Sequence, residues 1–288
     1  MNKILPVFSK IRIHPLTWAV MGLGAITAQF MELLMMFFIV LIHELGHAAA
    51  AQICGWRIKV VTLLPFGGEL ETEEHGNRPW KEEMAVLLAG PLQHLWLYAL
   101  AFLLYVNGWM GDHLYQEFLL FNTVIMAVNF LPVWPLDGGK LLFIFLSLRY
   151  PFVQAHRLII QYSIGILAVL LVCLLSLNPL NFNWWVVAGF LGYSLWKEWK
   201  HRQYVFMRFL LERHYGHQQD IRAISKLEAA RETPIFEILE HFRRDNKHVI
   251  VIKKDMKEIG KLDESEVLHA CFTSKLAYRP IGELLYPY

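Results

Sequence analysis

Two histidines and a glutamate stand close together in the sequence His43-Glu44-Leu45-Gly46-His47. On an α-helix, residues four apart share one face about 6 Å apart along the axis, so the two imidazoles can bind one metal ion. Glu44 can then remove a proton from a water molecule that the metal activates. The pattern predicts a hydrolytic zinc site with His43 and His47 as ligands and Glu44 as the general base.

This motif lies inside the uninterrupted apolar stretch Leu33–Ala51. An acidic or basic residue at the centre of a membrane span costs about 2.5–3.5 kcal/mol, so three ionisable residues there call for a functional explanation. The alternative interpretation is that these side chains only form hydrogen bonds between helices. Gln93 and His94, in a later apolar segment, are expected to bond a neighbouring helix in that way.

Catalytic zinc usually has three protein ligands, and a later segment offers a third. The stretch Asn129–Gly139 contains two prolines and ends in Asp137-Gly138-Gly139. Prolines and glycines interrupt a helix, and irregular backbone at membrane depth must be buried or line a wet cavity. Asp137 is therefore the candidate third ligand, although its role could be only to break the helix.

The composition indicates a helical membrane protein. Of 288 residues, 56% are hydrophobic and 14% aromatic, which is more than an ordinary soluble domain contains. The net charge of +2 gives no reason to expect a nucleic-acid partner. The three cysteines form no C-x-x-C pair, so neither a disulfide framework nor a thiolate metal site is predicted.

The hydrophobic pattern predicts six membrane-spanning helices, the first of them short and the fourth long. They are expected at Pro15–Gln29, Glu32–Cys54, Met84–Val106, Glu117–Ser147, Leu158–Leu177 and Trp184–Trp196.

Charges between these segments predict the topology. Lys and Arg precede the first segment and follow the second, fourth and sixth, whereas Phe30–Met31, Asn107–Gln116 and Asn178–Asn183 contain none. By the positive-inside rule, both termini are cytosolic. The second and fourth segments then run in the same direction, so His43 and Asp137 lie at similar depth toward the cytosolic side, as a shared metal requires.

The pair of motifs, H-E-L-G-H and N-x-x-P-x-x-P-x-D-G-G, resembles that of the site-2 protease family of intramembrane zinc metalloproteases. This resemblance implies one zinc ion bound by His43, His47 and Asp137, with Glu44 as the catalytic base. The expected fold is a polytopic α-helical membrane protein with a membrane re-entrant loop, followed by a small α/β cytosolic domain.

The resemblance also implies substrate-binding residues. Pro65-Phe66-Gly67-Gly68 is similar to the re-entrant loop, which is thought to help present the substrate as an extended strand, although an ordinary cytosolic turn is the alternative. Asn129, which opens the aspartate motif, could hydrogen-bond the substrate carbonyl or instead a neighbouring helix. The expected substrate contacts are Asn129, Phe66, Gly67, Gly68 and Pro135.

The six-span layout with a cytosolic C-terminal domain is most similar to the sporulation branch of that family, which releases sigma-K from its membrane-associated precursor. The resemblance implies a pro-sigma factor as substrate, membrane-protein regulators, and a location in a membrane that surrounds the forespore.

Beyond residue 202 the charge density rises, which predicts a membrane domain at 1–202 and a cytosolic linker and domain at 203–288. A helix from Thr233 to Phe242, strands at His248–Ile252 and Glu258–Leu262, and a helix at Asp263–Phe272 resemble one cystathionine-beta-synthase (CBS) module. That resemblance implies pairing with a second chain and possible ATP binding. Asp263 replaces the Ser or Thr of the nucleotide motif, which favours pairing or substrate docking.

Two other functions would use the same residues. A membrane metal transporter or metal sensor would bind metal at His43, His47 and Asp137 but would have little use for Glu44, and the internal repeats usual in transporters are not recognisable. An inactive membrane scaffold is disfavoured because both motifs are intact.

Overall fold

The computed structural model describes residues 10–27, 29–64, 67–72, 78–177, 182–216, 223–254 and 257–285. The chain divides into two compact units, which are described one at a time. The first comprises Met1–Glu74, Lys81–Leu141 and Gly165–Gly192, and the second His75–Trp80, Leu142–Ile164 and Tyr193–Tyr288.

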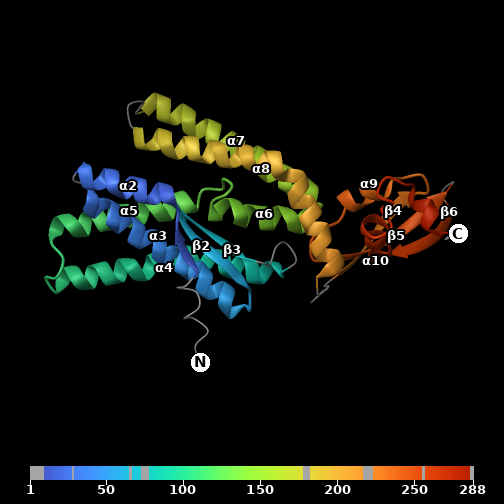
Figure 1. The fold of residues 1–288 in the computed structure, drawn as a ribbon, viewed down its shortest axis with the longest axis horizontal. Coiled ribbons are helices and arrows are strands. Elements are labelled where there is room, and N and C mark those ends of the chain that lie inside the picture. Colours follow the sequence, from blue (N-terminus) through green and yellow to red (C-terminus); the bar gives the residue numbers. More distant parts are fainter. Residues whose placement is uncertain are drawn as a thin grey trace. The chain divides into compact units, whose positions relative to one another are not determined.

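Long helices dominate the described part of the chain (Figure 1). They are α2 (Pro15–Ile26), α3 (Phe30–Ile53), α4 (Trp80–Val106), α5 (Asp112–Asn129), α6 (Asp137–Arg149), α7 (Phe152–Leu177) and α8 (Phe182–Tyr215). Each of the six expected apolar segments contains a helix. The fourth is divided into α5 and α6 by residues 130–136, so the break predicted from its prolines and glycines is confirmed.

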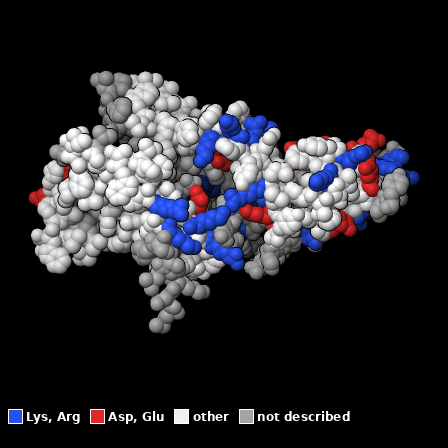
Figure 2. Space-filling model, in the orientation of Figure 1, with Lys and Arg blue, Asp and Glu red and all other residues white. Residues whose placement is uncertain are grey.

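Three of these helices, α3, α4 and α7, are long and apolar enough to cross a membrane. The outer surface of α4 has the composition expected for contact with lipid, because its exposed side chains are large and apolar. Leu92, Leu95, Phe102, Leu103 and Val106 are each 54–63% exposed. On the face shown in Figure 2, most of the surface of the first unit is free of charged residues.

The strands of a small sheet lie before and after α3 in the sequence. Strand β2 (Ile58–Leu64) lies between β1 (Ile11–Ile13), to which it is parallel, and β3 (Gly67–Thr72), to which it is antiparallel. Ile58 and Val61 of β2 are buried in one apolar cluster with Ala48 and Ala51 of α3. The sequence predicted a loop near residues 65–68. Gly67 and Gly68 begin strand β3, while residues 65–66, between β2 and β3, lie outside the described residues.

Helices α3, α4 and α5 pack around a common apolar cluster. Ile39 of α3, Leu97 and Ala101 of α4 and Phe118 of α5 are all buried in it. This cluster fixes the three helices against one another about one turn from the motif residues on α3.

The second unit contains a three-stranded sheet with two helices and a 3-10 turn. Its elements are β4 (Ala223–Ala230), α9 (Ile235–Glu240), β5 (Asn246–Lys254), β6 (Lys257–Asp263), α10 (Glu264–Phe272) and η1 (Ile281–Leu285). Strand β5 is central, parallel to β4 and antiparallel to β6. The two predicted strands and two predicted helices are present, and β4 is an additional strand that the sequence did not reveal.

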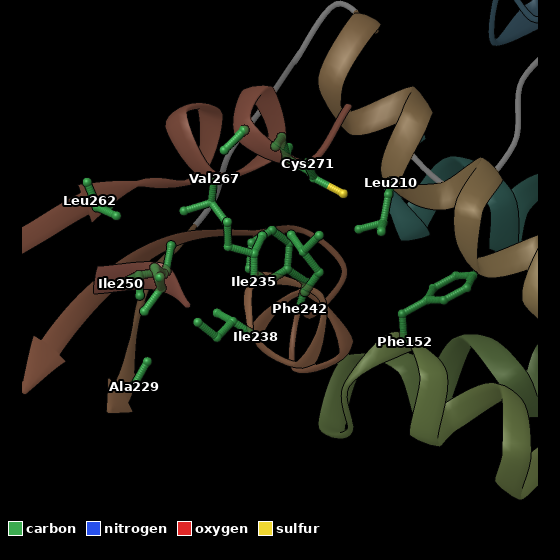
Figure 3. Packing of buried hydrophobic residues seen from close by; sticks show 14 of the residues in the cluster. Phe152, Leu210, Ala229, Ile235, Ile238, Phe242, Ile250, Leu262, Val267 and Cys271 are labelled. Atoms are coloured by element: carbon green, nitrogen blue, oxygen red, sulfur yellow. The ribbon is translucent and has the colours of Figure 1, made fainter. Parts of the chain in front are cut away.

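The core of the second unit also includes residues from the ends of α7 and α8 (Figure 3). Phe152 of α7 and Phe209 of α8 are stacked with ring centroids 4.1 Å apart, and both are buried. Leu210 of α8 packs in the same cluster as Phe242 and Ile250. Helix α8 is continuous through residue 202, where the composition changes.

Candidate metal centre

Helix α3 carries the first three residues of the site. His43, Glu44 and His47 are 2%, 6% and 5% exposed, so the charged and polar part of this helix faces the protein interior. Their spacing brings the two Nε2 atoms of the histidines to 3.0 Å from each other. The ligand atoms of all three side chains lie within 4.8 Å of one another.

Gly90 of α4 makes room for this cluster. A Cβ atom at Gly90 would lie 2.8 Å from His43 Nε2 and would contact His47 Nε2 and Cε1 even more closely. Such a contact is too short for any side chain other than hydrogen, so only glycine lets α4 approach the two histidines this closely. Gly90 is thus part of the wall of the site.

Asp137 reaches the histidines from the first turn of α6. Its Oδ2 lies 3.0 Å from His43 Nε2 and 3.1 Å from His47 Nε2, and the residue is 5% exposed. Gly138 permits the preceding segment to fold back over this turn, because a Cβ there would lie 2.5 Å from Leu131 O. The positive end of the helix dipole and Lys140 Nζ, 3.9 Å from Oδ1, favour the carboxylate.

The outer nitrogens of both histidines are also bonded. His47 Nδ1 lies 2.7 Å from the carbonyl oxygen of Val86, and His43 Nδ1 lies 3.0 Å from His94 Nε2. His94 in turn contacts the side chain of Asn122 on α5, and both are fully buried. The expected interhelical bond of His94 is therefore confirmed, with a motif histidine and Asn122 as partners. The same expectation for Gln93 is wrong, because its side chain donates to the carbonyl oxygen of Ala89 in its own helix. Asn122 was missed because nothing in its neighbourhood forms a recognisable motif.

The side chain of Glu44 points toward β3. A Cβ at Gly68 would lie 2.6 Å from Glu44 Oε1, so the backbone of β3 passes directly beside this carboxylate. Gly67, the first residue of β3, has φ 155°. An extended peptide next to β3 would consequently run close to Glu44.

The other expected substrate contacts are placed as follows. Asn129 ends α5 and is half-buried, and its side chain makes no hydrogen bond to another described residue. Pro135 lies in the half-buried segment between α5 and α6. Phe66 lies outside the described residues.

The three converging atoms fit a zinc ion. Zinc bonds of 2.0–2.1 Å in a tetrahedron separate neighbouring ligand atoms by about 3.3 Å, close to the 3.0–3.1 Å found among the two Nε2 atoms and Asp137 Oδ2. Two imidazoles and one carboxylate are also a donor set that suits zinc and leaves a fourth position open.

Comparison with known proteins identifies the family. Residues 31–118 match the family model of Peptidase family M50. The sequence is 46% identical to Stage IV sporulation protein FB of Bacillus subtilis (strain 168) over 288 residues, which are 100% of both chains. The chain belongs to the M50 family of site-2 proteases. This M50 protein is a site-2 type intramembrane zinc metalloprotease.

Less similar relatives match only part of the chain. Zinc metalloprotease MJ0392 of Methanocaldococcus jannaschii is 30% identical over 154 residues, 51% of this chain and 43% of that protein. A solved structure, the Site-2 Protease from Methanocaldococcus jannaschii, superimposes with a TM-score of 0.53 at 24% identity. It covers 65% of this chain and 89% of the solved chain, and it supports the M50 fold independently of the motifs.

Proposed function

We propose that this M50 protease cleaves a membrane-associated protein near the cytosolic face, with His43, His47 and Asp137 as zinc ligands and Glu44 as the general base. The observation that carries the proposal is the convergence of two Nε2 atoms and one carboxylate oxygen at 3.0–3.1 Å, with Glu44 beside them. The sequence motif places the histidines together, but only the fold brings Asp137 to them.

Each of the chain's own groups has a part in this hydrolysis. When bound, zinc polarises the substrate carbonyl and makes a water molecule more acidic. Glu44 accepts the proton of the attacking water and then donates it to the leaving amine, since a base becomes an acid in the second half of the reaction. The amide of Asn129 donates a hydrogen bond to the oxygen of the scissile carbonyl.

The substrate must be extended at the site, because a helix hides its carbonyl groups in hydrogen bonds. We infer that β3, with Gly68 beside Glu44 and Gly67 next to it in the strand, receives an extended substrate segment, and that Pro135 also contacts this segment. A substrate contact by Phe66 stays a prediction. The proximity of Gly68 to Glu44 supports this arrangement. A substrate segment of low helix stability would be cleaved most readily.

The identity over the full length to a stage IV sporulation protein supports a role in sporulation. We propose a pro-sigma factor, pro-sigma-K, as the substrate, membrane proteins as regulators, and a membrane surrounding the forespore as the location. The proposed topology has six spans and both termini in the cytosol, on the evidence of the basic residues between the apolar segments.

For residues 203–288 we propose a CBS-like module that pairs with a second copy or docks the substrate. The order of β4, α9, β5, β6 and α10 supports a module of this kind. Asp263 precedes α10, bonds Ser265 Oγ at 2.7 Å and pairs with Lys247 at 3.0 Å, so its carboxylate already has partners. ATP binding stays a prediction.

The test compares the wild type with Glu44→Gln in detergent. Both are expected to retain about one zinc per chain, while cleavage of a membrane-associated precursor falls by about 10²–10⁴-fold in the variant, the usual contribution of a general base. A variant that cleaves as fast as the wild type would exclude Glu44 as the base. A wild type that binds zinc but cleaves nothing would instead favour the metal transporter or sensor.

A further inference from the structure

The two histidines of the site are held by different kinds of partner. His47 Nδ1 lies 2.7 Å from the carbonyl oxygen of Val86. A carbonyl oxygen has no hydrogen to give, so the ring must donate through Nδ1. A neutral imidazole carries one hydrogen, and His47 Nε2 is therefore left with a free lone pair that faces His43 and Asp137.

The partner of His43 is a side chain, and its hydrogen could lie on either nitrogen. Asn122 on α5 determines which nitrogen of His43 carries the hydrogen. Asn122 Nδ2 donates to the carbonyl oxygen of His94 at 3.1 Å, which fixes the orientation of the amide. Asn122 Oδ1 then faces His94 Nδ1 at 2.7 Å and can only accept a hydrogen bond.

The orientation of the Asn122 amide determines the hydrogen positions on His94 and then on His43. Because Nδ1 of His94 must donate to Asn122, its Nε2 has a free lone pair and accepts from His43 Nδ1 at 3.0 Å. Nδ1 of His43 thus carries the hydrogen of that ring. Nε2 of His43 is left free, 3.0 Å from Asp137 Oδ2 and 3.0 Å from His47 Nε2.

We propose that Asn122 and His94 are positioning residues that hold His43 in the tautomer whose Nε2 can bind zinc. The proposal rests on the ligand set proposed above. Asn122 and His94 are 0% exposed and His43 is 2% exposed, so bulk water does not reach them to replace a lost partner. The tautomer of His43 is therefore determined by the backbone carbonyl of His94 on α4, acting through the side chains of Asn122 and His94. This chain of hydrogen bonds is called the relay below.

Because Asn122, His94 and His43 are buried, the loss of one hydrogen bond among them should lower zinc affinity. If Asn122 were apolar, His94 could place its hydrogen on Nε2, and His43 would then have to accept at Nδ1 and direct an N–H toward the metal position. Loss of such an outer partner usually lowers metal affinity or activity by about 10–100-fold. The same loss is expected here, and His94→Leu combined with Asn122→Leu should be no worse than His94→Leu alone, since both act through one path.

The experiment measures zinc affinity of full-length protein in detergent by competition with a chelator, for Asn122→Leu and its matched control Thr123→Val. Thr123 is the next residue on α5 and bonds Tyr98 of α4 at 2.8 Å, so its replacement also removes a side-chain hydrogen bond between α4 and α5. Asn122→Leu is expected to bind zinc about 10–100-fold more weakly, and Thr123→Val like the wild type. The visible absorption of bound Co²⁺ should change only in the first variant.

Equal zinc affinity of Asn122→Leu and the wild type would overturn the proposal, as would an equal loss in Thr123→Val. If Asn122→Leu does not give monodisperse protein, Asn122→Asp decides. Its carboxylate still accepts from His94 Nδ1, so zinc affinity should fall less than about tenfold, and a larger loss would refute the relay.

Asp137→Ala in the same assay separates this proposal from the ligand assignment. If Asp137→Ala binds zinc as tightly as the wild type, the ligand set is wrong whatever Asn122 does. If Asp137→Ala loses zinc while Asn122→Leu keeps it, the ligand set stands and only the relay fails.

Discussion

At the scale of single residues, Gly90 offers a test of the metal centre that replaces no functional side chain. A Cβ there would lie 2.8 Å from His43 Nε2 and closer still to His47. Gly90→Ala should displace both imidazoles and abolish zinc binding and cleavage. Gly165→Ala on α7 is the matched control, because its Cβ would meet nothing within 4 Å. Zinc content of the two purified variants gives the answer, and zinc retained in Gly90→Ala would refute the geometry.

Gly68 tests Glu44 separately from the metal. The added methyl group of Gly68→Ala would lie 2.6 Å from Glu44 Oε1 and would push this carboxylate away, while the histidines are not among the nearest atoms. We expect zinc content to be unchanged and cleavage to fall at least about tenfold, part of what a general base contributes. Measuring both on one preparation is decisive, because a parallel loss of zinc would mean that β3 supports the metal centre itself.

The motif residues of the site are predictable from the sequence, whereas Asn122 is not. His43, Glu44 and His47 are predictable because helical geometry joins residues four apart. Asp137 could be proposed because a carboxylate beside prolines and glycines is unusual in an apolar segment. Asn122 has no such context: it is a single polar residue on α5, and its importance arises only because α4 places His94 between it and His43.

At the scale of secondary-structure elements, one buried ion pair joins the end of α8 to α10. Arg213 Nε and Nη2 donate to the two oxygens of Glu264 at 2.6 and 2.9 Å, and the backbone N–H of His248 donates to Oε2 at 2.8 Å. Burial alone would raise the pKa of Glu264, but the bonds from His248 and Arg213 outweigh it and lower the pKa below its ordinary value.

This ion pair predicts a pH dependence of stability. A carboxyl group with a lowered folded-state pKa stabilises the fold fully above its ordinary pKa of 4.5, and the stabilisation is lost as the pH falls toward the folded value. Near neutral pH, Glu264→Gln should lower the free energy of unfolding by roughly 3–5 kcal/mol, because Arg213 loses the carboxylate with which it pairs, and the cost should shrink in acid. Calorimetric unfolding of the full chain at several pH values tests this.

The control for that experiment is Glu258→Gln, which removes a surface ion pair with Lys261. Both side chains of that pair are about half exposed, so the expected cost is below about 1 kcal/mol at any pH. A Glu264→Gln variant with the same small, pH-independent effect would contradict the interpretation of the Arg213–Glu264 pair.

The elements themselves were predicted unevenly. Long apolar runs identify α3, α4 and α7 because nothing but a helix satisfies such a backbone in a membrane. Strand β5 was recognisable from its run of β-branched residues, Val249–Ile252, and β6 follows it closely in the sequence. Strand β4 was not, because it is an edge strand with mostly exposed side chains, and β1 is only three residues long. Their pairing depends on β5 and β2, which are distant in sequence.

At the scale of the whole molecule, the topology determines which side of the membrane supplies water and substrate to the site. The absence of Lys and Arg from Asn107–Gln116, set against basic residues after the second and fourth apolar segments, predicts that Trp109 is outside and the C-terminal domain is cytosolic. Trp109 and Tyr278 are 82% and 83% exposed, so a cysteine at either position would be open to reagents.

A charged, membrane-impermeant thiol reagent therefore tests the topology in intact cells, once the three native cysteines are replaced by alanine. Trp109→Cys should be labelled at once and Tyr278→Cys only after the membrane is permeabilised. Labelling of Tyr278→Cys in intact cells, with Trp109→Cys labelled as well, would mean that the chain crosses the membrane an even number of times after Trp109, whereas an odd number is predicted. If Trp109→Cys were also protected in intact cells, α3 would be inverted as well, and the metal centre would lie toward the opposite face. Cleavage of a cytosolic sigma-factor precursor would then be excluded, while the zinc chemistry of the site would be unaffected.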